Sequence, residues 1–197
     1  MNSTGVIVLA AGNSSRLGRP KQLLPYRGRT LLAHVIGEAL AAGLQPVTVV
    51  TGAFHAEVSD SLRGLSIDIV FNPHWQMGMA SGIVAGLSRL LLLQPDVGAV
   101  IIAVCDQPFI SSALLLQLIE THETSGKGMV ACTYADSMGT PVLFARIYFE
   151  RLFALSGSAG AKTLLKQYAA DLATVGFPAG EVDIDTGEDA KKLEENE

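Results

Sequence analysis

The chain has 197 residues, which suits one domain with a core of its own, since a typical domain has roughly 150 residues. Hydrophobic residues make up 49% of the sequence and charged residues 17%, a balance too apolar for a disordered chain. The formal net charge is −5 and no basic block occurs, which argues against a nucleic-acid partner.

Apolar runs rich in β-branched residues alternate with segments of helical periodicity. The predicted strands are residues 5–11, 46–51, 66–71, 97–105, 128–134, 140–144 and 182–185. The predicted helices are residues 31–42, 57–63, 81–93, 113–121, 147–155 and 161–170, with a last helix after a capping box at 186–189. Thr30 and Ser111 or Ser112 are expected helix caps. This order predicts a three-layer α/β fold, a Rossmann-like and mostly parallel sheet with helices on both faces.

Three features of the sequence indicate where in the cell the protein is located. Cys105 and Cys132 each lie in an apolar run, so we expect buried thiols in a reducing cytoplasm. Residues 97–105 form the longest apolar stretch, which is far shorter than the roughly 18 residues of a membrane span. Residues 1–4 lack the basic region of a signal peptide. We therefore expect a cytoplasmic protein without a membrane partner.

The first predicted strand is followed by a loop of small and basic residues, 12–21, and ligands of such sheets bind at this edge. Small residues let backbone N–H groups converge on an anion, and Arg16, Arg19 and Lys21 add positive charge. The loop has neither the Gly-Lys-Ser/Thr of a P-loop nor the Gly-x-Gly-x-x-Gly of a dinucleotide site. It predicts a phosphate site, and a solvated turn is the alternative.

Carboxylates follow two of the predicted strands. Asp106 comes directly after residues 97–105, near the first loop if the two strands are neighbours. One carboxylate facing triphosphate oxygens suits Mg²⁺, which needs only one or two protein carboxylates. Asp183 and Asp185 share one face of the last predicted strand, so one of them could be a second metal ligand. A helix cap is the alternative role for Asp106, and the alternative for the last strand is that Asp185 or Thr186 caps the final helix.

Residues 72–82, after the third predicted strand, contain the sequence's only Trp together with two Met and two Gly. This composition is typical of a semi-apolar loop that contacts a ligand. The alternative is that the Trp and Met side chains of this segment fill the core. Composition leaves the two interpretations open.

Four ordered stretches, spread over nearly the whole chain, resemble the molybdenum-cofactor nucleotidyltransferases, the MobA-like NTP transferase family. They are Leu9-Ala10-Ala11-Gly12-x-Ser14-x-Arg16-Leu17-Gly18-x-Pro20-Lys21-Gln22-Leu23-Leu24, Asn72-Pro73-x-Trp75-x-x-Gly78-Met79-Ala80-Ser81, Cys105-Asp106-Gln107-Pro108 and Asp183-Ile184-Asp185-Thr186. The resemblance implies one such domain over residues 1–197, with a sheet of the nucleotide-diphospho-sugar transferase type. The first two stretches are more similar to the cytidylyltransferases of the family than to its guanylyltransferases.

Carried over residue by residue, the resemblance implies catalytic roles for Arg16 and Lys21 at the triphosphate and for Asp106 at Mg²⁺. It implies that Asp183 or Asp185 helps to bind the metal. The further nucleotide-binding residues that it implies are Leu9, Ala10, Ala11, Gly12, Ser14 and Ser81.

This sequence departs from the family pattern in two places. Gly82 stands where the family usually has the second Ser of a Met-x-Ser-Ser motif. Residues 157–162 read Gly-Ser-Ala-Gly-Ala-Lys, where the family often has Gly-Asp-x-Gly-Ala-Arg. The second change leaves open what this loop does to the acceptor, because Lys lacks the planar fork of Arg.

The activity implied by the resemblance is transfer of CMP from CTP to the phosphate of molybdopterin, with release of pyrophosphate. The alternatives are a guanylyltransferase or another nucleotidyltransferase of this sheet family, an NADPH-dependent oxidoreductase acting on planar rings, and a chaperone that loads cofactor into a molybdenum hydroxylase apoenzyme. The absence of a Gly-x-Gly-x-x-Gly turn argues against the dinucleotide.

Overall fold

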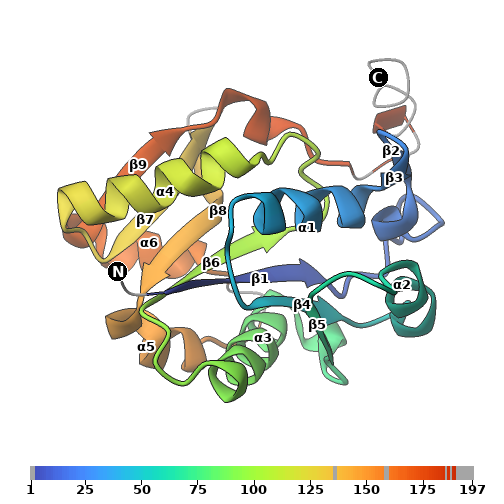
Figure 1. Cartoon of the computed structure of the whole chain (residues 1–197), viewed down its shortest axis with the longest axis horizontal. Coiled ribbons are helices and arrows are strands. Elements are labelled where there is room, and N and C mark those ends of the chain that lie inside the picture. The colour runs from blue at the N-terminus through green and yellow to red at the C-terminus, as the bar shows by residue number, and fades with distance from the viewer. Residues whose placement is uncertain (1–2, 135–136, 158–159, 185, 187, 190–197) are drawn as a thin grey trace.

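The computed structural model describes residues 3–134, 137–157, 160–184, 186 and 188–189, and these form a three-layer α/β fold (Figure 1). Within them, a seven-stranded sheet has the order β5-β4-β1-β6-β8-β7-β9. Its strands are β1 (Thr4–Ala10), β4 (Val47–Thr51), β5 (Asp68–Phe71), β6 (Ala99–Val104), β7 (Met129–Tyr134), β8 (Ser137–Ala145) and β9 (Leu172–Gly176). Within this sheet, the described pairs are parallel except for the two made by β8, which are antiparallel. The predicted mostly parallel sheet is confirmed.

Helices cover both faces of this sheet (Figure 1). One face carries α1 (Leu31–Ala41), α2 (His55–Ser61) and α4 (Ser112–Ser125), and the other carries α3 (Met79–Leu93), α5 (Phe149–Phe153) and α6 (Lys162–Gln167). Short 3-10 segments lie at Lys21–Leu23, Trp75–Met77, Arg146–Tyr148, Ala169–Asp171 and Pro178–Glu181, and a small hairpin joins β2 (Pro25–Tyr26) to β3 (Arg29–Thr30). No helix in the described part of the chain is long and apolar enough to cross a bilayer.

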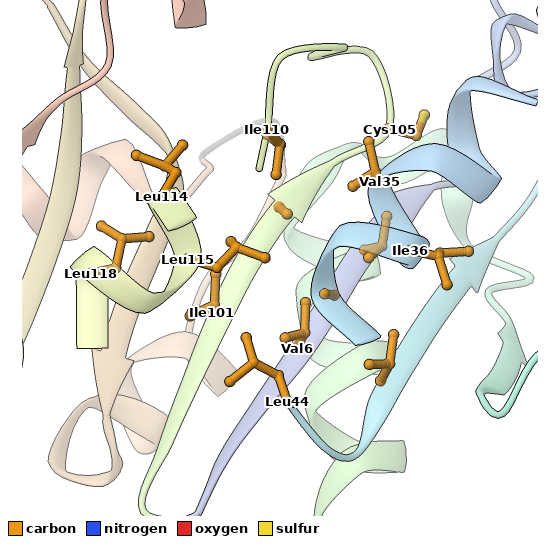
Figure 2. Packing of buried hydrophobic residues seen from close by; sticks show 14 of the residues in the cluster. Val6, Val35, Ile36, Leu44, Ile101, Cys105, Ile110, Leu114, Leu115 and Leu118 are labelled. Carbon is orange, nitrogen blue, oxygen red and sulfur yellow. The ribbon is translucent and has the colours of Figure 1, made fainter. Parts of the chain in front are cut away.

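Strand β1 shows why the sheet forms the middle layer. Its consecutive residues are fully buried on opposite faces, Val6 and Val8 toward α1 and Ile7 toward α3. Figure 2 shows Val35 of α1 and Leu115 of α4 packing over the first of these faces. Because both faces are covered, the strand has no polar side chain from Gly5 to Ala10 and shows no alternation of polar and apolar residues.

Side-chain caps fix where three helices begin. Thr30 caps α1 and Ser111 caps α4, each hydroxyl accepting a 3.2 Å hydrogen bond from the third residue of its helix. Thr186 and Asp189 each accept a hydrogen bond from the other's backbone N–H, which confirms the predicted capping box. Since Ser111 caps α4, the alternative role of Asp106 as its cap is wrong.

The C-terminal part differs from the prediction. Residues 182–184 form no strand, and Asp185 lies outside the described residues. Instead, Ile184 is buried in a cluster beside the β2–β3 hairpin, and its N–H donates to the carbonyl of Asp106 at 3.1 Å. The last strand of the sheet is β9, which was not predicted. The predicted helix 147–155 is a 3-10 turn followed by α5, and the helix predicted at 161–170 ends at Gln167.

Helix α3 lies so close to the sheet that Gly86 has no room for a side chain. A Cβ at this position would lie 2.5 Å from Cγ2 of Ile7 and 2.9 Å from Cγ2 of Val50, both buried. We expect Gly86→Ala to lower the free energy of unfolding by up to about 2 kcal/mol. Overpacking costs about 1–3 kcal/mol, and the gain in helix propensity returns about 1 kcal/mol. Chemical denaturation measures the change.

Gly37→Ala in α1 is the matched control. A Cβ there would meet only the end of the Arg29 side chain, which is flexible and can move aside. This variant should therefore be more stable than the original by up to about 1 kcal/mol. If both substitutions shift the denaturation midpoint in the same direction, close packing of α3 against the sheet does not explain the effect of Gly86→Ala.

Candidate active site

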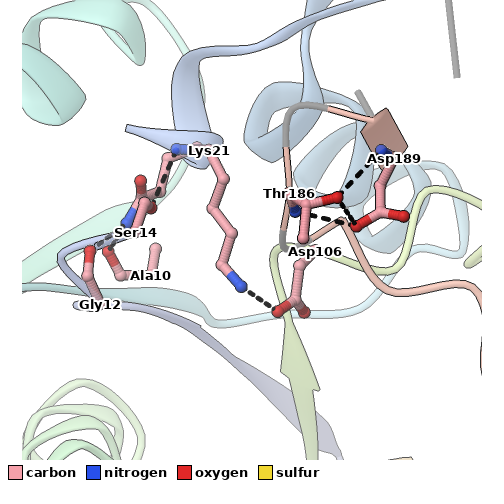
Figure 3. A network of polar contacts seen from close by, with 8 residues as sticks. Ala10, Gly12, Ser14, Lys21, Asp106, Thr186 and Asp189 are labelled. Atoms are coloured by element: carbon pink, nitrogen blue, oxygen red, sulfur yellow. Dashed lines mark hydrogen bonds and ion pairs between the residues drawn. The ribbon is translucent and has the colours of Figure 1, made fainter. Parts of the chain in front are cut away.

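The loop after β1 is held in shape by hydrogen bonds to its own backbone. The buried amide of Gln22 donates to the carbonyls of Ala10 at 2.8 Å and Gly12 at 2.9 Å. The hydroxyl of Ser14 accepts a 3.0 Å hydrogen bond from the backbone N–H of Lys21 (Figure 3). These contacts fix where Lys21 leaves the loop.

This loop encloses a hollow of about 210 Å³, which we call the loop hollow. It is lined by Gly12, Asn13, Ser14, Ser15, Arg16 and Lys21. Small residues together with two cationic side chains are the combination that suits a phosphate group. The structure thus brings Arg16 and Lys21 to one place, while the binding of phosphate there stays a prediction.

Lys21 forms an ion pair with Asp106, from the end of β6. Its ammonium lies 2.5 Å from Oδ2 of the carboxylate, with the two side chains 15% and 18% exposed (Figure 3). The residues are 85 positions apart, and they meet because β1 and β6 are parallel neighbours with Leu9 opposite Val104. Partial burial weakens solvent screening, so this pair is coupled more strongly than a surface pair.

The second oxygen of Asp106 tests whether these residues fit a divalent metal. Oδ1 is buried and has no hydrogen-bond partner in the described part of the chain, an arrangement that is costly unless a cation or donor meets it. The described residues contain no group of three or more His, Cys, Asp or Glu that could hold a metal alone. One carboxylate completed by substrate phosphates and water is the pattern of Mg²⁺, so the residues fit this ion.

Of the two aspartates expected to help to bind the metal, the structure describes Asp183. Asp183 is exposed and directly precedes Ile184, whose N–H bonds the carbonyl of Asp106. The segment therefore runs beside Asp106, while Asp185 lies outside the described residues. The metal role of either residue stays a prediction.

A cleft of about 360 Å³, the main cleft, opens at the carboxyl ends of β1 and β6. Its far wall is the segment before α3, including Trp75 and Gly78. It shares Gly12, Asn13 and Lys21 with the loop hollow, so the two spaces form one continuous site. Parallel sheets of this kind bind their ligands at this edge.

Residues 6–172 match the MobA-like NTP transferase domain. This chain belongs to the MobA-like NTP transferase family. The sheet and its helices are those of the nucleotide-diphospho-sugar transferase fold.

The chain is also similar to three known proteins. Nicotine blue oxidoreductase of Paenarthrobacter nicotinovorans is 33% identical, over 96% of this chain and 95% of its own length. The crystal structure of Rv0371c from Mycobacterium tuberculosis H37Rv has a TM-score of 0.84 and 29% identity, covering 98% of each chain, and the same protein is known in complex with manganese. Molybdopterin-guanine dinucleotide biosynthesis protein A from Archaeoglobus fulgidus shares the fold, with a TM-score of 0.68 and 21% identity over 98% and 97% of the chains.

Most of the nucleotide-binding residues expected in this MobA-like chain gather at one place. The main cleft or the loop hollow is lined by Leu9, Ala11, Gly12, Ser14, Arg16, Lys21 and Asp106. Ala10 is different, because its side chain is buried on the opposite face of β1, in the cluster that contains α1. Its carbonyl, held by Gln22, still shapes the loop.

Ser81 holds the segment before α3 together. Its hydroxyl lies 2.8 Å from the carbonyl oxygen of Gly78 and 2.9 Å from that of His74, and it accepts a 2.9 Å hydrogen bond from the amide of Asn72. Asn72 is itself buried and accepts from the backbone N–H of His74. These bonds use the hydroxyl within the protein, and the predicted contact of Ser81 with the base stays a prediction.

Gly52, at the end of β4, lets Trp75 approach the first loop. A Cβ on Gly52 would lie 2.5 Å from the carbonyl oxygen of Ala11 and 2.8 Å from Cβ of Trp75. Several of residues 72–82 line the main cleft, while their contact with a ligand stays a prediction. Sequence reasoning assigned no role to Gly52 or Gln22, although a Gln directly before two leucines was a signal of a buried polar contact.

The thiol beside Asp106 is not a nucleophile. Burial, followed by the negative charge of Asp106, raises the pKa of Cys105 to about 12. Burial alone raises the pKa of Cys132 to about 12. Both are free thiols, as expected, and both stay protonated at neutral pH.

The role of Gln22 can be tested by Gln22→Leu, which keeps the approximate size but removes both donors. Because two carbonyls then lose their partners, we expect the free energy of unfolding to fall by about 1–3 kcal/mol. Amide hydrogen exchange should also become faster in residues 12–21. Gln117→Leu, at an exposed position of α4, is the control and should change neither measurement. Unchanged exchange in the Gln22 variant would show that the loop keeps its shape without these bonds.

Proposed function

We propose that this protein transfers CMP from CTP to the phosphate of molybdopterin and releases pyrophosphate. The observation that carries the proposal is the cationic loop after β1, whose Lys21 lies against Asp106 at the edge of the main cleft. Membership of the MobA-like NTP transferase family supports the reaction type. The choice of CTP and molybdopterin rests on the form of the loop and of the Asn72–Ser81 segment.

The reaction needs charge neutralisation more than it needs a base. The second pKa of a phosphate monoester is about 6, so the acceptor is largely dianionic at pH 7 and is already a nucleophile. One of its oxygens bonds to the α-phosphorus of CTP in line, and the bond to pyrophosphate breaks. Arg16 and Lys21 bind the triphosphate and offset the charge that accumulates.

Asp106 is the proposed holder of Mg²⁺, helped by Asp183 or Asp185. When bound, this ion supplies positive charge to the phosphate oxygens. Before substrate arrives, Lys21 compensates the charge of Asp106 at this position. The long, flexible Lys21 stem then allows its ammonium to turn toward the triphosphate.

Asp106→Asn tests this assignment. We expect kcat to fall by about a hundredfold or more, as for the loss of an electrostatic stabiliser, while CTP binding is largely kept. Pyrophosphate release and nucleotide titration measure the two quantities. Asp68→Asn is the control, because Asp68 pairs with Arg89 at 2.6 Å at the opposite end of the sheet. Equal turnover in the two variants would contradict the proposal.

The nucleotide is tested by pyrophosphate release with CTP, GTP, UTP and ATP, each with purified molybdopterin as acceptor. We expect CTP to be strongly preferred. A preference for GTP would overturn the assignment of the base and make the protein a guanylyltransferase. We also propose a location in the cytoplasm, which the buried free thiols favour, and a molybdenum hydroxylase apoenzyme as the recipient of the product.

The similarity to nicotine blue oxidoreductase favours a second candidate, NADPH-dependent reduction of a planar ring compound. The loop after β1 lacks the Gly-x-Gly-x-x-Gly turn typical of dinucleotide sites, which is why we place this candidate second. Incubation with NADPH and nicotine blue should give no NADPH oxidation above the background without protein. Turnover in that assay, without pyrophosphate release from any nucleotide, would exchange the order of the two candidates.

A further inference from the structure

A second cavity of about 410 Å³ lies next to the main cleft, on the α3 and α6 side of the sheet, and the proposed reaction has so far given it no role. Its walls are mainly apolar, with Ile102 and Val142 from the sheet and Leu165 from α6. Both spaces are small for ligand pockets, which range over about 300–1,000 Å³. Each suits one ring system better than a large ligand.

Met79, the first residue of α3, lines both the main cleft and the second cavity, and no other described residue does so. A Cβ at Gly160 would lie 2.8 Å from its sulfur, so the side chain reaches across to the loop before α6. Ile102 lines the second cavity and Val104 the main cleft. These residues share one face of β6 and are about 7 Å apart along it, so Met79 divides two adjacent spaces.

Polar groups of the second cavity are tied to the Asp106 region. The Tyr134 hydroxyl lies 3.4 Å from the amide nitrogen of Gln107, which follows Asp106 and also donates to the carbonyl of Gly180 at 2.9 Å. Thr140 lines the same cavity. Burial raises the pKa of Tyr134, so its hydroxyl stays a donor at neutral pH. Lys162, exposed on the rim, adds a positive charge.

We propose that the second cavity binds the ring end of the acceptor, and that Met79 separates this ring from the nucleotide and selects it. The inference rests on the proposed transfer reaction. The chemistry favours a flat, fused heterocycle: its faces fit the apolar walls, its polar edge meets Tyr134 and Thr140, and a negative charge meets Lys162. A thioether packs well on such a ring.

Thr163→Trp tests the cavity, because Thr163 lines it yet is exposed, so a large side chain can enter without disturbing the core. We expect the KM for molybdopterin to rise about tenfold, with kcat and the KM for CTP nearly unchanged. Gln167→Trp, exposed on the same helix but not lining the cavity, is the control and should change none of these. Unchanged acceptor KM, or an equal rise in both KM values, would overturn the proposal.

Met79→Ala tests the divider. The preference for molybdopterin over glycerol 3-phosphate, a phosphate without a ring, should fall about tenfold in kcat/KM. Met79→Leu keeps an apolar side chain of similar size and should keep the preference. If the alanine variant keeps it as well, Met79 does not select the ring.

A binding experiment separates failure of this inference from failure of the proposed function. The fluorescence of 6-carboxypterin, an anionic fused heterocycle, is titrated with protein in the absence of nucleotide. Binding that Thr163→Trp weakens about tenfold supports the cavity even if no nucleotide yields pyrophosphate. Absence of binding to the unaltered protein, or binding that both Trp variants leave unchanged, rejects the cavity even if pyrophosphate release is robust.

Discussion

The ion pair between Lys21 and Asp106 is the interaction on which the rest of the site depends. It joins two loops that follow neighbouring parallel strands, and it is shielded enough from solvent to be strong. The internal bonds of Gln22 and Ser14 place Lys21. Helix α4 takes its cap from Ser111, which leaves the Asp106 carboxylate for the cleft. One of its oxygens meets the ammonium, while the other is buried without a hydrogen-bond partner among the described residues.

From this pair, the site extends in two directions along the sheet edge. The loop hollow, with Arg16, continues from Lys21 and carries positive charge. The second cavity continues past Met79 and is largely apolar. In the proposed reaction, the charged donor substrate and the ring-bearing acceptor would occupy separate surfaces that meet near Asp106.

The sequence predicted most clearly the strands that are buried on both faces. β1 and β6 are buried on both faces, so their apolar runs were unambiguous, and the adjacency of Asp106 to the first loop followed from neighbouring strands. β9 was missed because it is partly exposed and small-residue-rich. The strand predicted at 182–185 was wrong over 182–184. The side chain of Ile184 is buried beside the β2–β3 hairpin, and its segment does not join the sheet. Hydrogen bonds between residues distant in sequence, such as those of Gln22, produce no periodic pattern in the sequence, so they were not predicted.

The central claim is that Asp106 holds a divalent ion beside a triphosphate bound at the first loop. The most direct measurement is the binding of Mn²⁺, followed by electron paramagnetic resonance, to the protein with CTP present. The account predicts a ternary complex whose Mn²⁺ affinity falls at least about tenfold in Asp106→Asn, since even outer-shell changes at metal sites cost that much. Equal Mn²⁺ affinity in the two proteins, with CTP bound to both, would contradict it.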